Sequence, residues 1–158
     1  LHMFIREKEA LDTISKTQTI AVPNVYDCNS IKGNAFLLLE HIQVKTSEST
    51  DFKLLASKLA QLHNISASHF GFEQHNYIGS LHQNNTKHKK WSDFYIIERL
   101  IPQLKLAHSN KLLSYQEIPN IETLQYYCNA LFEGVKPSLL HGDLWNGNFL
   151  ISKEGKIR

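Results

Sequence analysis

Several polar side chains in the segment His141-Gly142-Asp143-Leu144-Trp145-Asn146-Gly147-Asn148 have the types and spacing that catalysis needs. The carboxylate of Asp143 can accept a proton from a hydroxyl group, and the amide oxygen of Asn148 suits Mg²⁺, a hard cation that prefers oxygen ligands. An Asp followed five residues later by an Asn is the spacing that phosphoryl-transfer enzymes of the protein-kinase type use. We expect His141 to hydrogen-bond this loop and hold its shape.

Hydrophobic residues flank the loop and predict a strand on each side of it. Leu139 and Leu140 precede the loop, and Phe149 and Leu150 follow it. Strands hold a catalytic side chain more firmly than a long flexible loop does. The alternative is a structural hairpin with polar turn residues, because HxDxxxxN alone fixes few positions. The continuous run HGDLWNGN between two expected strands favours the catalytic interpretation.

The N-terminal part of the chain predicts one helix followed by an antiparallel pair of strands. Residues 4–16 combine apolar positions with good helix formers. Residues 19–28 and 35–42 are rich in strand formers, with turn-forming Asn29-Ser30 and Gly33-Asn34 between them. Because the second run is apolar on both faces, we expect it to be a buried strand rather than a solvated edge.

The next part of the chain predicts a helix and then a long polar stretch. Residues 51–62 carry apolar side chains at helical spacing, with Ser49, Thr50 or Asp51 as the N-cap. Residues 65–90 are rich in Asn, His, Ser and Gly, which favours a long polar loop over a packed element.

The last part of the chain predicts two further helices and then strands again, and this order of elements is typical of an α+β fold. Residues 91–104 have helical spacing, but Pro102 must kink or interrupt this helix because it has no amide donor. Another helix is expected after Asn120, a suitable N-cap. Strands are then expected on both sides of the catalytic loop, which makes a hairpin, with a turn at Glu154-Gly155.

Composition and charge exclude several classes of protein. The chain has 158 residues, is 42% hydrophobic, and carries 17 Lys and Arg against 15 Asp and Glu, a net charge of +2. This near balance gives no reason to expect nucleic acid or a membrane as a partner. No apolar run has the roughly 18 residues of a membrane span, and the two cysteines have no disulfide or zinc spacing. We therefore expect a cytoplasmic protein without metal-binding histidine clusters.

The sequence resembles the fructosamine kinase family, also called ketosamine 3-kinases, within the group that includes aminoglycoside and choline kinases. The family motif HGDLW-x-GN matches residues 141–148, and its Trp distinguishes it from the looser HGDxxxxN of the related kinases. The supporting matches, spread over most of the chain, are Met3-Phe4 and Glu7, Val22-Pro23, Phe36 to Glu40, Leu62-His63, Phe70-Gly71, Gln83 to Asn85, Trp91 and Phe94, and Arg99-Leu100.

The resemblance implies a role for each matching residue. Asp143 would be the proton acceptor, Asn148 a Mg²⁺ ligand, and Glu7, on a helix like αC of protein kinases, the partner of a phosphate-binding Lys. The hinge would comprise Leu39, Glu40, His41 and Ile42, where the Glu40 carbonyl and the Ile42 amide would bind the adenine of ATP. The alternatives are a plain strand end for the hinge and a solvated carboxylate for Glu7.

Trp145 is the residue that the resemblance connects with the substrate. A Trp face can pack against the apolar face of a sugar or against a protonated amine, and the family implies a sugar-amine substrate. The substrate would be a ketosamine, either a small molecule or one attached to a protein. The enzyme would phosphorylate a sugar hydroxyl of this ketosamine, as a step in protein deglycation and repair. The structural alternative is that Trp145 fills the base of the loop.

The family pattern also implies parts that these residues do not contain. We find no glycine-rich loop, no strand Lys before Glu7 and no metal-binding Asp after the loop. The expectation is thus a kinase-like fragment, with residues 1–42 a partial N-lobe and residues 43–158 a partial C-lobe, inactive by itself. The alternatives are an aminoglycoside- or choline-type phosphotransferase and a non-catalytic kinase-like remnant. The sequence does not determine the preferred sugar or the oligomeric state.

Overall fold

The computed structural model describes residues 1–158 as two compact units, one of residues 1–65 with 139–158 and one of residues 66–138. The first unit contains α1 (His2–Thr17), β1 (Val25–Ile31), β2 (Asn34–Leu39) and α2 (Ser49–His63). The second contains β3 (Asn76–Ile78), β4 (Leu81–Gln83), α3 (Trp91–Tyr95), a π-helical turn (Ile96–Leu100), α4 (Ile101–Ser109), a 3₁₀ turn (Tyr115–Glu117) and α5 (Ile121–Leu131). No helix is long and apolar enough to cross a membrane. The division into lobes at residue 42 stays a prediction.

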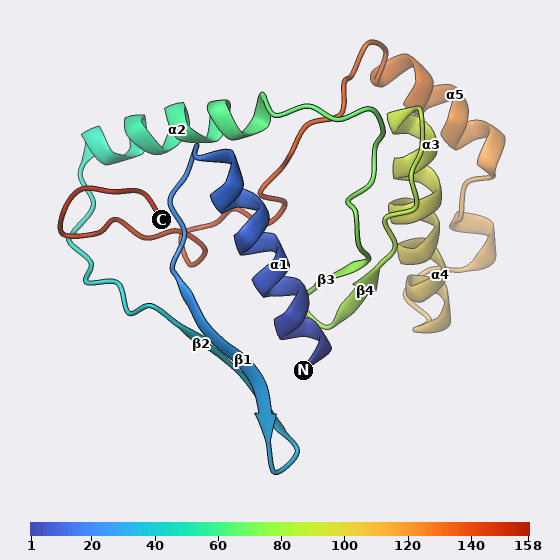
Figure 1. Cartoon of the computed structure of the whole chain (residues 1–158). Coiled ribbons are helices and arrows are strands. Elements are labelled where there is room, and N and C mark those ends of the chain that lie inside the picture. The colour runs from blue at the N-terminus through green and yellow to red at the C-terminus, as the bar shows by residue number, and fades with distance from the viewer. The chain divides into compact units, whose positions relative to one another are not determined.

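The strands β1 and β2 form the antiparallel pair that the sequence predicts (Figure 1). Their connection is a two-residue turn at Lys32-Gly33, where both residues have positive φ, 50° and 81°. Such a turn matches the twist of a hairpin, and glycine adopts its backbone conformation without steric cost. The expected turn at Asn29-Ser30 is wrong, because both residues belong to β1, and residues 19–22 precede the strand rather than forming one.

The prediction that β2 is a buried strand is also wrong. β2 pairs with β1 alone, and none of its residues is buried. Leu38 keeps 53% of its surface exposed. The apolar pattern predicts which side chains avoid water, but the coverage of a strand depends on elements that pack against it.

The helix α2 begins near the predicted position, but its N-cap differs from the expected residues. Glu48 is the N-cap, and Asp51 lies in the first turn. Asp51 accepts a hydrogen bond from the backbone N–H of Glu48 at 2.9 Å and pairs with Lys45 at 2.8 Å. These contacts stabilise the helix start by satisfying a free backbone donor and placing negative charge at the positive end of the helix.

The core of the first unit joins α2 to the C-terminal residues. Leu55, Ile151 and Ile157 are buried together, with Ile20, Leu59 and Phe149 packed around them. Residues 150–158 form a small hairpin: Leu150 and Arg158 exchange backbone hydrogen bonds, and Ile151 pairs with Ile157. The turn predicted at Glu154-Gly155 is confirmed by a hydrogen bond from the Gly155 N–H to the Ser152 carbonyl.

The strands expected on either side of the catalytic loop do not pair with each other. Ser138, before the loop, bridges Ser66, whereas Ser152, after the loop, bridges Val44. Single bridges replace the expected hairpin, because each flank finds its hydrogen-bond partner in a different segment. The loop is therefore held at two separate anchors.

The second unit orders part of the stretch that was expected to be a polar loop. β3 and β4 form a short hairpin, and Asn85 is buried. The side-chain amide of Asn85 donates to the Gln74 carbonyl and to Asn76 Oδ1, while its Oδ1 accepts from Arg99. These hydrogen bonds satisfy the buried polar side chain and connect the stretch to the helical part of the unit.

The interruption predicted at Pro102 is confirmed as the π-helical turn before α4. In this turn the N–H of Ile101 donates to the carbonyl of Ile96, five residues earlier. Pro102 has no N–H for the carbonyl of Glu98, and Arg99 Nη1 donates to that carbonyl instead at 2.9 Å. The Arg99 side chain thus compensates for the missing helical hydrogen bond.

The helix α5 begins as the sequence predicts, since Asn120 accepts a hydrogen bond from the N–H of Thr123 at 2.8 Å. Cys128 is buried, whereas Ile121 and Leu131 of the same helix are exposed. Phe132, just after the helix, contacts Trp91 in the aromatic cluster of this unit. Trp91 therefore belongs to the packing of the second unit.

The contacts of Asp51 predict how the stability of the first unit depends on pH. The hydrogen bond from Lys45, followed by that from the Glu48 backbone, lowers the pKa of Asp51 below its usual value. A carboxyl whose folded-state pKa is lowered stabilises the fold above its unfolded pKa of about 4, and this stabilisation is lost as the pH falls through the lower folded-state value.

We expect Asp51→Asn to lower the Tm by a few degrees at neutral pH, as loss of a helix-cap contact does. The difference from the unmodified chain should shrink as the pH falls below about 4. Thermal unfolding followed by circular dichroism across this range measures both effects. The matched control is Asp12→Asn, an exposed Asp on α1. A Tm difference independent of pH would contradict the prediction.

Candidate active site

The structure brings together the two residues of the catalytic motif that the spacing predicts to cooperate. The Nδ2 of Asn148 donates to the backbone carbonyl of Asp143 at 2.8 Å and to its Oδ2 at 3.0 Å. The N–H of Asn148 donates to the carbonyl of Trp145 at 2.9 Å. One residue therefore closes the loop from Asp143 to Asn148 through three hydrogen bonds.

Both side chains keep oxygen atoms available for chemistry. Asp143 and Asn148 are exposed, and the hydrogen bonds between them use the amide nitrogen of Asn148 and one carboxylate oxygen of Asp143. The Oδ1 atoms of both residues take no part in this contact. The structure contains no cluster of three or more His, Cys, Asp or Glu residues that could hold a metal ion. Mg²⁺ commonly binds one or two side-chain oxygens and completes its shell with phosphate oxygens and water, so the Oδ1 of Asn148, the predicted metal ligand, fits it.

Backbone hydrogen bonds also hold the chain just before and just after the loop. The N–H of Leu139 donates to the carbonyl of Ile65 at 2.9 Å, and the N–H of Arg158 donates to the carbonyl of Leu150 at 2.9 Å. The buried Ile151 then holds the outgoing chain in the core. The loop is thus exposed at its polar residues and fixed at both ends.

The two glycines of the loop are required for different reasons. Gly142 has a φ of +86°, a left-handed conformation that favours glycine. The φ of Gly147 does not lie in that region, but the indole ring of Trp145 lies against its Cα. A Cβ at position 147 would come within 2.5 Å of the Trp145 ring, closer than two carbon atoms can approach. No pattern in the sequence predicted this contact.

Trp145 has one ring face toward Gly147, but most of the side chain stays in solvent. Its exposed fraction is 58%. The structural alternative, in which Trp145 fills the base of the loop, does not match this exposure. An exposed indole held against a glycine provides an apolar surface two residues after Asp143 in the chain.

His141 does not make the hydrogen bond that the sequence predicts. Its side chain is half-buried, and its Nδ1 is buried with no hydrogen-bond partner. The ring can therefore support the loop only by packing. Asn148 closes the loop instead. The sequence predicts Asn148 as a metal ligand and does not indicate this second role.

The segment Leu39–Ile42 begins at the last residue of β2. The N–H of Glu40 donates to the Asn24 carbonyl at 2.8 Å, and the Glu40 carboxylate accepts hydrogen bonds from the N–H and the side-chain amide of Asn24 at 3.1 and 2.9 Å. The carbonyl of Glu40 and the amide of Ile42 take no part in these bonds, and His41 is exposed. These are the backbone groups that the family resemblance predicts to bind adenine, and this role stays a prediction.

Arg158 is a partner of this segment that sequence reasoning missed. Its Nη1 lies 3.0 Å from Glu40 Oε2 and 3.4 Å from the carbonyl of Val22. The hydrogen bond from the Asn24 backbone lowers the pKa of Glu40, and the charge of Arg158 lowers it further, against the effect of desolvation. A pair separated by 118 residues has no local sequence signal.

Glu7 is exposed on α1 and makes no ion pair in the structure. Its neighbours on the helix, Arg6 and Glu9, pair with each other. No hydrogen bond or ion pair connects Glu7, or the segment Leu39–Ile42, to the catalytic loop. The structure thus brings Asp143, Trp145 and Asn148 together in one loop, and Glu7 and the segment Leu39–Ile42 make no hydrogen bond or ion pair with them.

Solved structures define the class of this fold. A crystal structure named as a fructosamine-3-kinase from Haemophilus somnus matches with a TM-score of 0.85 and 30% identity, covering 99% of this chain and 52% of that one. Another, from Thermobifida fusca, matches with a TM-score of 0.80 and 27% identity. The chain therefore has a kinase-like fold of the fructosamine-3-kinase type over the part that it spans.

The family model for fructosamine kinase matches residues 1–158, and the chain belongs to the fructosamine kinase family. A probable ketoamine kinase of Vibrio parahaemolyticus is 38% identical over 99% of this chain and 54% of its own length. The chloroplastic protein-ribulosamine 3-kinase of Arabidopsis thaliana is 37% identical over 98% of this chain and 48% of its own length. The chain thus spans about half the length of the curated relatives that it matches.

The contact between Gly147 and Trp145 predicts the effect of one added methyl group. We expect Gly147→Ala to displace the indole, because a Cβ would overlap the ring. The indole N–H resonance of Trp145 should shift, and its fluorescence should change when measured in a Trp91→Phe background. Asn146→Ala, at the exposed position next to Gly147, is the control and should leave both signals in place. Unchanged signals in Gly147→Ala would rule out the contact.

Proposed function

We propose that these residues form part of an ATP-dependent kinase that phosphorylates a sugar hydroxyl of ketosamines. The observation that carries the proposal is the exposed carboxylate of Asp143, which Asn148 orients through its side-chain amide. Membership of the fructosamine kinase family supports the same reaction. A fixed, solvent-accessible carboxylate is what a proton acceptor for an incoming hydroxyl requires.

In this proposal Asp143 accepts the proton of the substrate hydroxyl while the hydroxyl oxygen attacks the γ-phosphorus of ATP. The bond from that phosphorus to the bridging oxygen breaks, and ADP leaves. Asn148 keeps the Asp143 carboxylate in place through its Nδ2. Because phosphoryl transfer depends mainly on positioning and electrostatics, this hydrogen bond has a direct catalytic use.

Three parts of the chain would bind the cofactors, ATP and Mg²⁺. Asn148 Oδ1 would hold Mg²⁺, which when bound neutralises charge on the phosphate oxygens. The segment from Leu39 through Glu40 and His41 to Ile42 would bind the adenine of ATP through its backbone. Glu7, which has no ion-pair partner in the structure, would pair with a phosphate-binding Lys supplied from outside these residues.

The substrate is proposed from the names of the relatives and from Trp145. One relative is named a ketoamine kinase and another a protein-ribulosamine 3-kinase. The exposed indole of Trp145 suits the apolar face of a sugar or a protonated amine. The enzyme would then act on free or protein-bound ketosamines in deglycation, and we propose that it does so in the cytoplasm, although the plant relatives are chloroplastic.

Asp143→Asn is expected to reduce kcat by about 10²–10⁴-fold, because an amide cannot accept the proton. The assay is ketosamine-dependent formation of ADP by a protein of the relatives' length that contains these residues. The side chains are similar in size, so the fold should be retained, and Asn146→Ala is the control that keeps activity. Full activity of Asp143→Asn would contradict the proposed role of the carboxylate.

Trp145→Ala tests the substrate assignment. We expect a raised KM for the ketosamine with the KM for ATP unchanged, since the exposed ring face would contact only the sugar or its amine. A screen of aminoglycosides and choline alongside fructosamine and ribulosamine measures the alternative substrates. Turnover of choline or an aminoglycoside in preference to ketosamines would reject the ketosamine proposal, and no turnover of any would favour a non-catalytic role.

We further propose that residues 1–158 by themselves transfer phosphate inefficiently. Glu7 has no lysine partner among these residues, and Asn148 is the only residue of the loop that we assign to a metal ion. A phosphoryl-transfer site needs more positive charge around the phosphates than this set can organise. Ketosamine-dependent ATP turnover by the 158-residue chain at ordinary kinase rates of 1–100 s⁻¹ would contradict this.

A further inference from the structure

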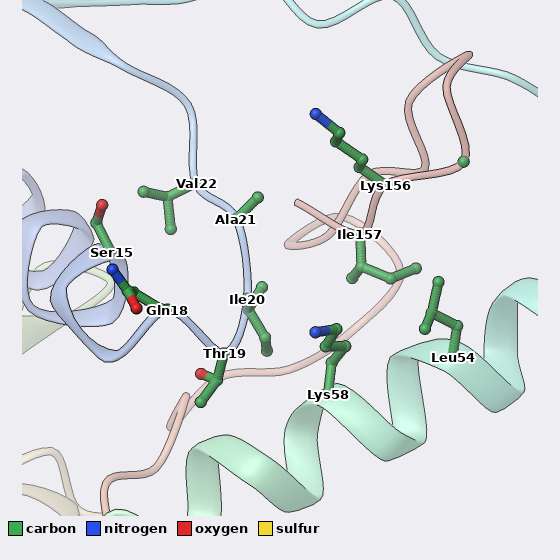
Figure 2. A pocket seen from close by; sticks show the side chains of 11 residues that line it. Ser15, Gln18, Thr19, Ile20, Ala21, Val22, Leu54, Lys58, Lys156 and Ile157 are labelled. Atoms are coloured by element: carbon green, nitrogen blue, oxygen red, sulfur yellow. The ribbon is translucent and has the colours of Figure 1, made fainter.

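A cavity of about 450 Å³ lies within the first unit (Figure 2). Its lining comes from the C-terminal end of α1, the segment that follows α1, α2 and the turn near Gly155. None of the lining residues belongs to the catalytic loop or to the segment Leu39–Ile42. The volume lies in the range of small-molecule binding sites.

The walls of the cavity are largely apolar. Ile20, Ala21 and Val22 line one side of it, and Leu54 and Ile157 line the other (Figure 2). Ile157 is buried in the core of the unit, and Ile20 packs against that core. Both sides of the cavity therefore contact the core of the unit, and its apolar walls are suited to the apolar body of a ligand.

The charge of the lining has one sign. Lys58 and Lys156 both line the cavity, and no Asp or Glu does. Lys58 is half-buried and has no ion pair, unlike Lys45, which pairs with Asp51. In Figure 2 the Lys58 side chain extends from α2 toward Ile20, whereas that of Lys156 points away from the other labelled residues. A partly desolvated ammonium group without a carboxylate partner favours an anion beside it.

The polar residues of the rim can add hydrogen bonds. Ser15 and Gln18, at the end of α1, line the cavity and have no side-chain partner among the hydrogen bonds of the structure. The hydroxyl of Thr19 is already hydrogen-bonded to that of Thr17 at 2.7 Å. A ligand that reaches Lys58 therefore finds free polar groups at the rim and apolar groups along the wall.

We propose that this cavity binds a small organic carboxylate with an apolar body. The carboxylate contacts the ammonium group of Lys58, and the apolar body lies against Ile20, Val22 and Ile157. The assignment uses only the cavity, its apolar wall and its unpaired cation. It is independent of the proposed phosphotransferase activity.

The test uses 4-phenylbutyrate as the probe and ¹H–¹⁵N correlation spectra of the 158-residue chain. We expect the probe to shift the amide resonances of Ile20, Ala21 and Lys58 in a saturable manner. The neutral analogue 4-phenylbutyramide has nearly the same shape and should bind about fivefold or more weakly, because it lacks the charge. Equal affinity for the two probes, or shifts only at residues outside the cavity, would overturn the proposal.

Variants of two lysines on the same helix identify the cation. Lys58→Met keeps the unbranched side chain and should bring the affinity for the carboxylate down to that for the amide. Lys53→Met, at an exposed position that does not line the cavity, should bind the probe as the unmodified chain does. If Lys58→Met fails to fold, Lys58→Gln and the comparison of the two probes on the unmodified chain still decide the outcome.

A second copy of the chain is the competing occupant of the cavity. Sedimentation velocity with and without the probe measures this directly. A monomer in both conditions supports a small-molecule site, whereas a dimer that dissociates when the probe is added shows that the cavity is an interface and overturns the proposal.

Discussion

The catalytic loop depends on the burial of Ile151 and Ile157 against Leu55 of α2. This contact fixes residues 150–158, and backbone hydrogen bonds between Leu150 and Arg158 hold the chain directly after the loop. Without that anchor Asn148 would lose its fixed position, and Asp143 would lose the hydrogen bonds that orient it. A hydrophobic contact thus determines the geometry of polar side chains that are themselves exposed.

The same C-terminal hairpin connects the loop with the segment proposed to bind adenine. Arg158 pairs with Glu40, while its neighbour Ile157 enters the core. The Glu40 side chain is held by Asn24 and Arg158, so the backbone around it is constrained while its carbonyl remains available. Two parts of the proposed site, far apart in sequence, therefore rest on one short hairpin.

Several elements were predictable because their signals are local. The N-cap of α5 at Asn120 and the interruption before Pro102 depend on residues within one or two helical turns. The burial of β2 and the pairing of the loop flanks were predicted wrongly, because both depend on which distant segment lies alongside. The tight contact of Gly147 with Trp145 was missed for a similar reason, since it depends on the side-chain conformation of Trp145.

Residue types and their spacing are enough to identify the chemical groups of the loop. The run HGDLWNGN placed a carboxylate, an indole and an amide within one short loop and indicated the family to which the chain belongs. The folded chain alone shows that Asn148 closes the loop, that His141 Nδ1 has no partner, and that Arg158 pairs with Glu40. The physical reason is that residue type limits which interactions a side chain can make, whereas packing and backbone pairing select the partner.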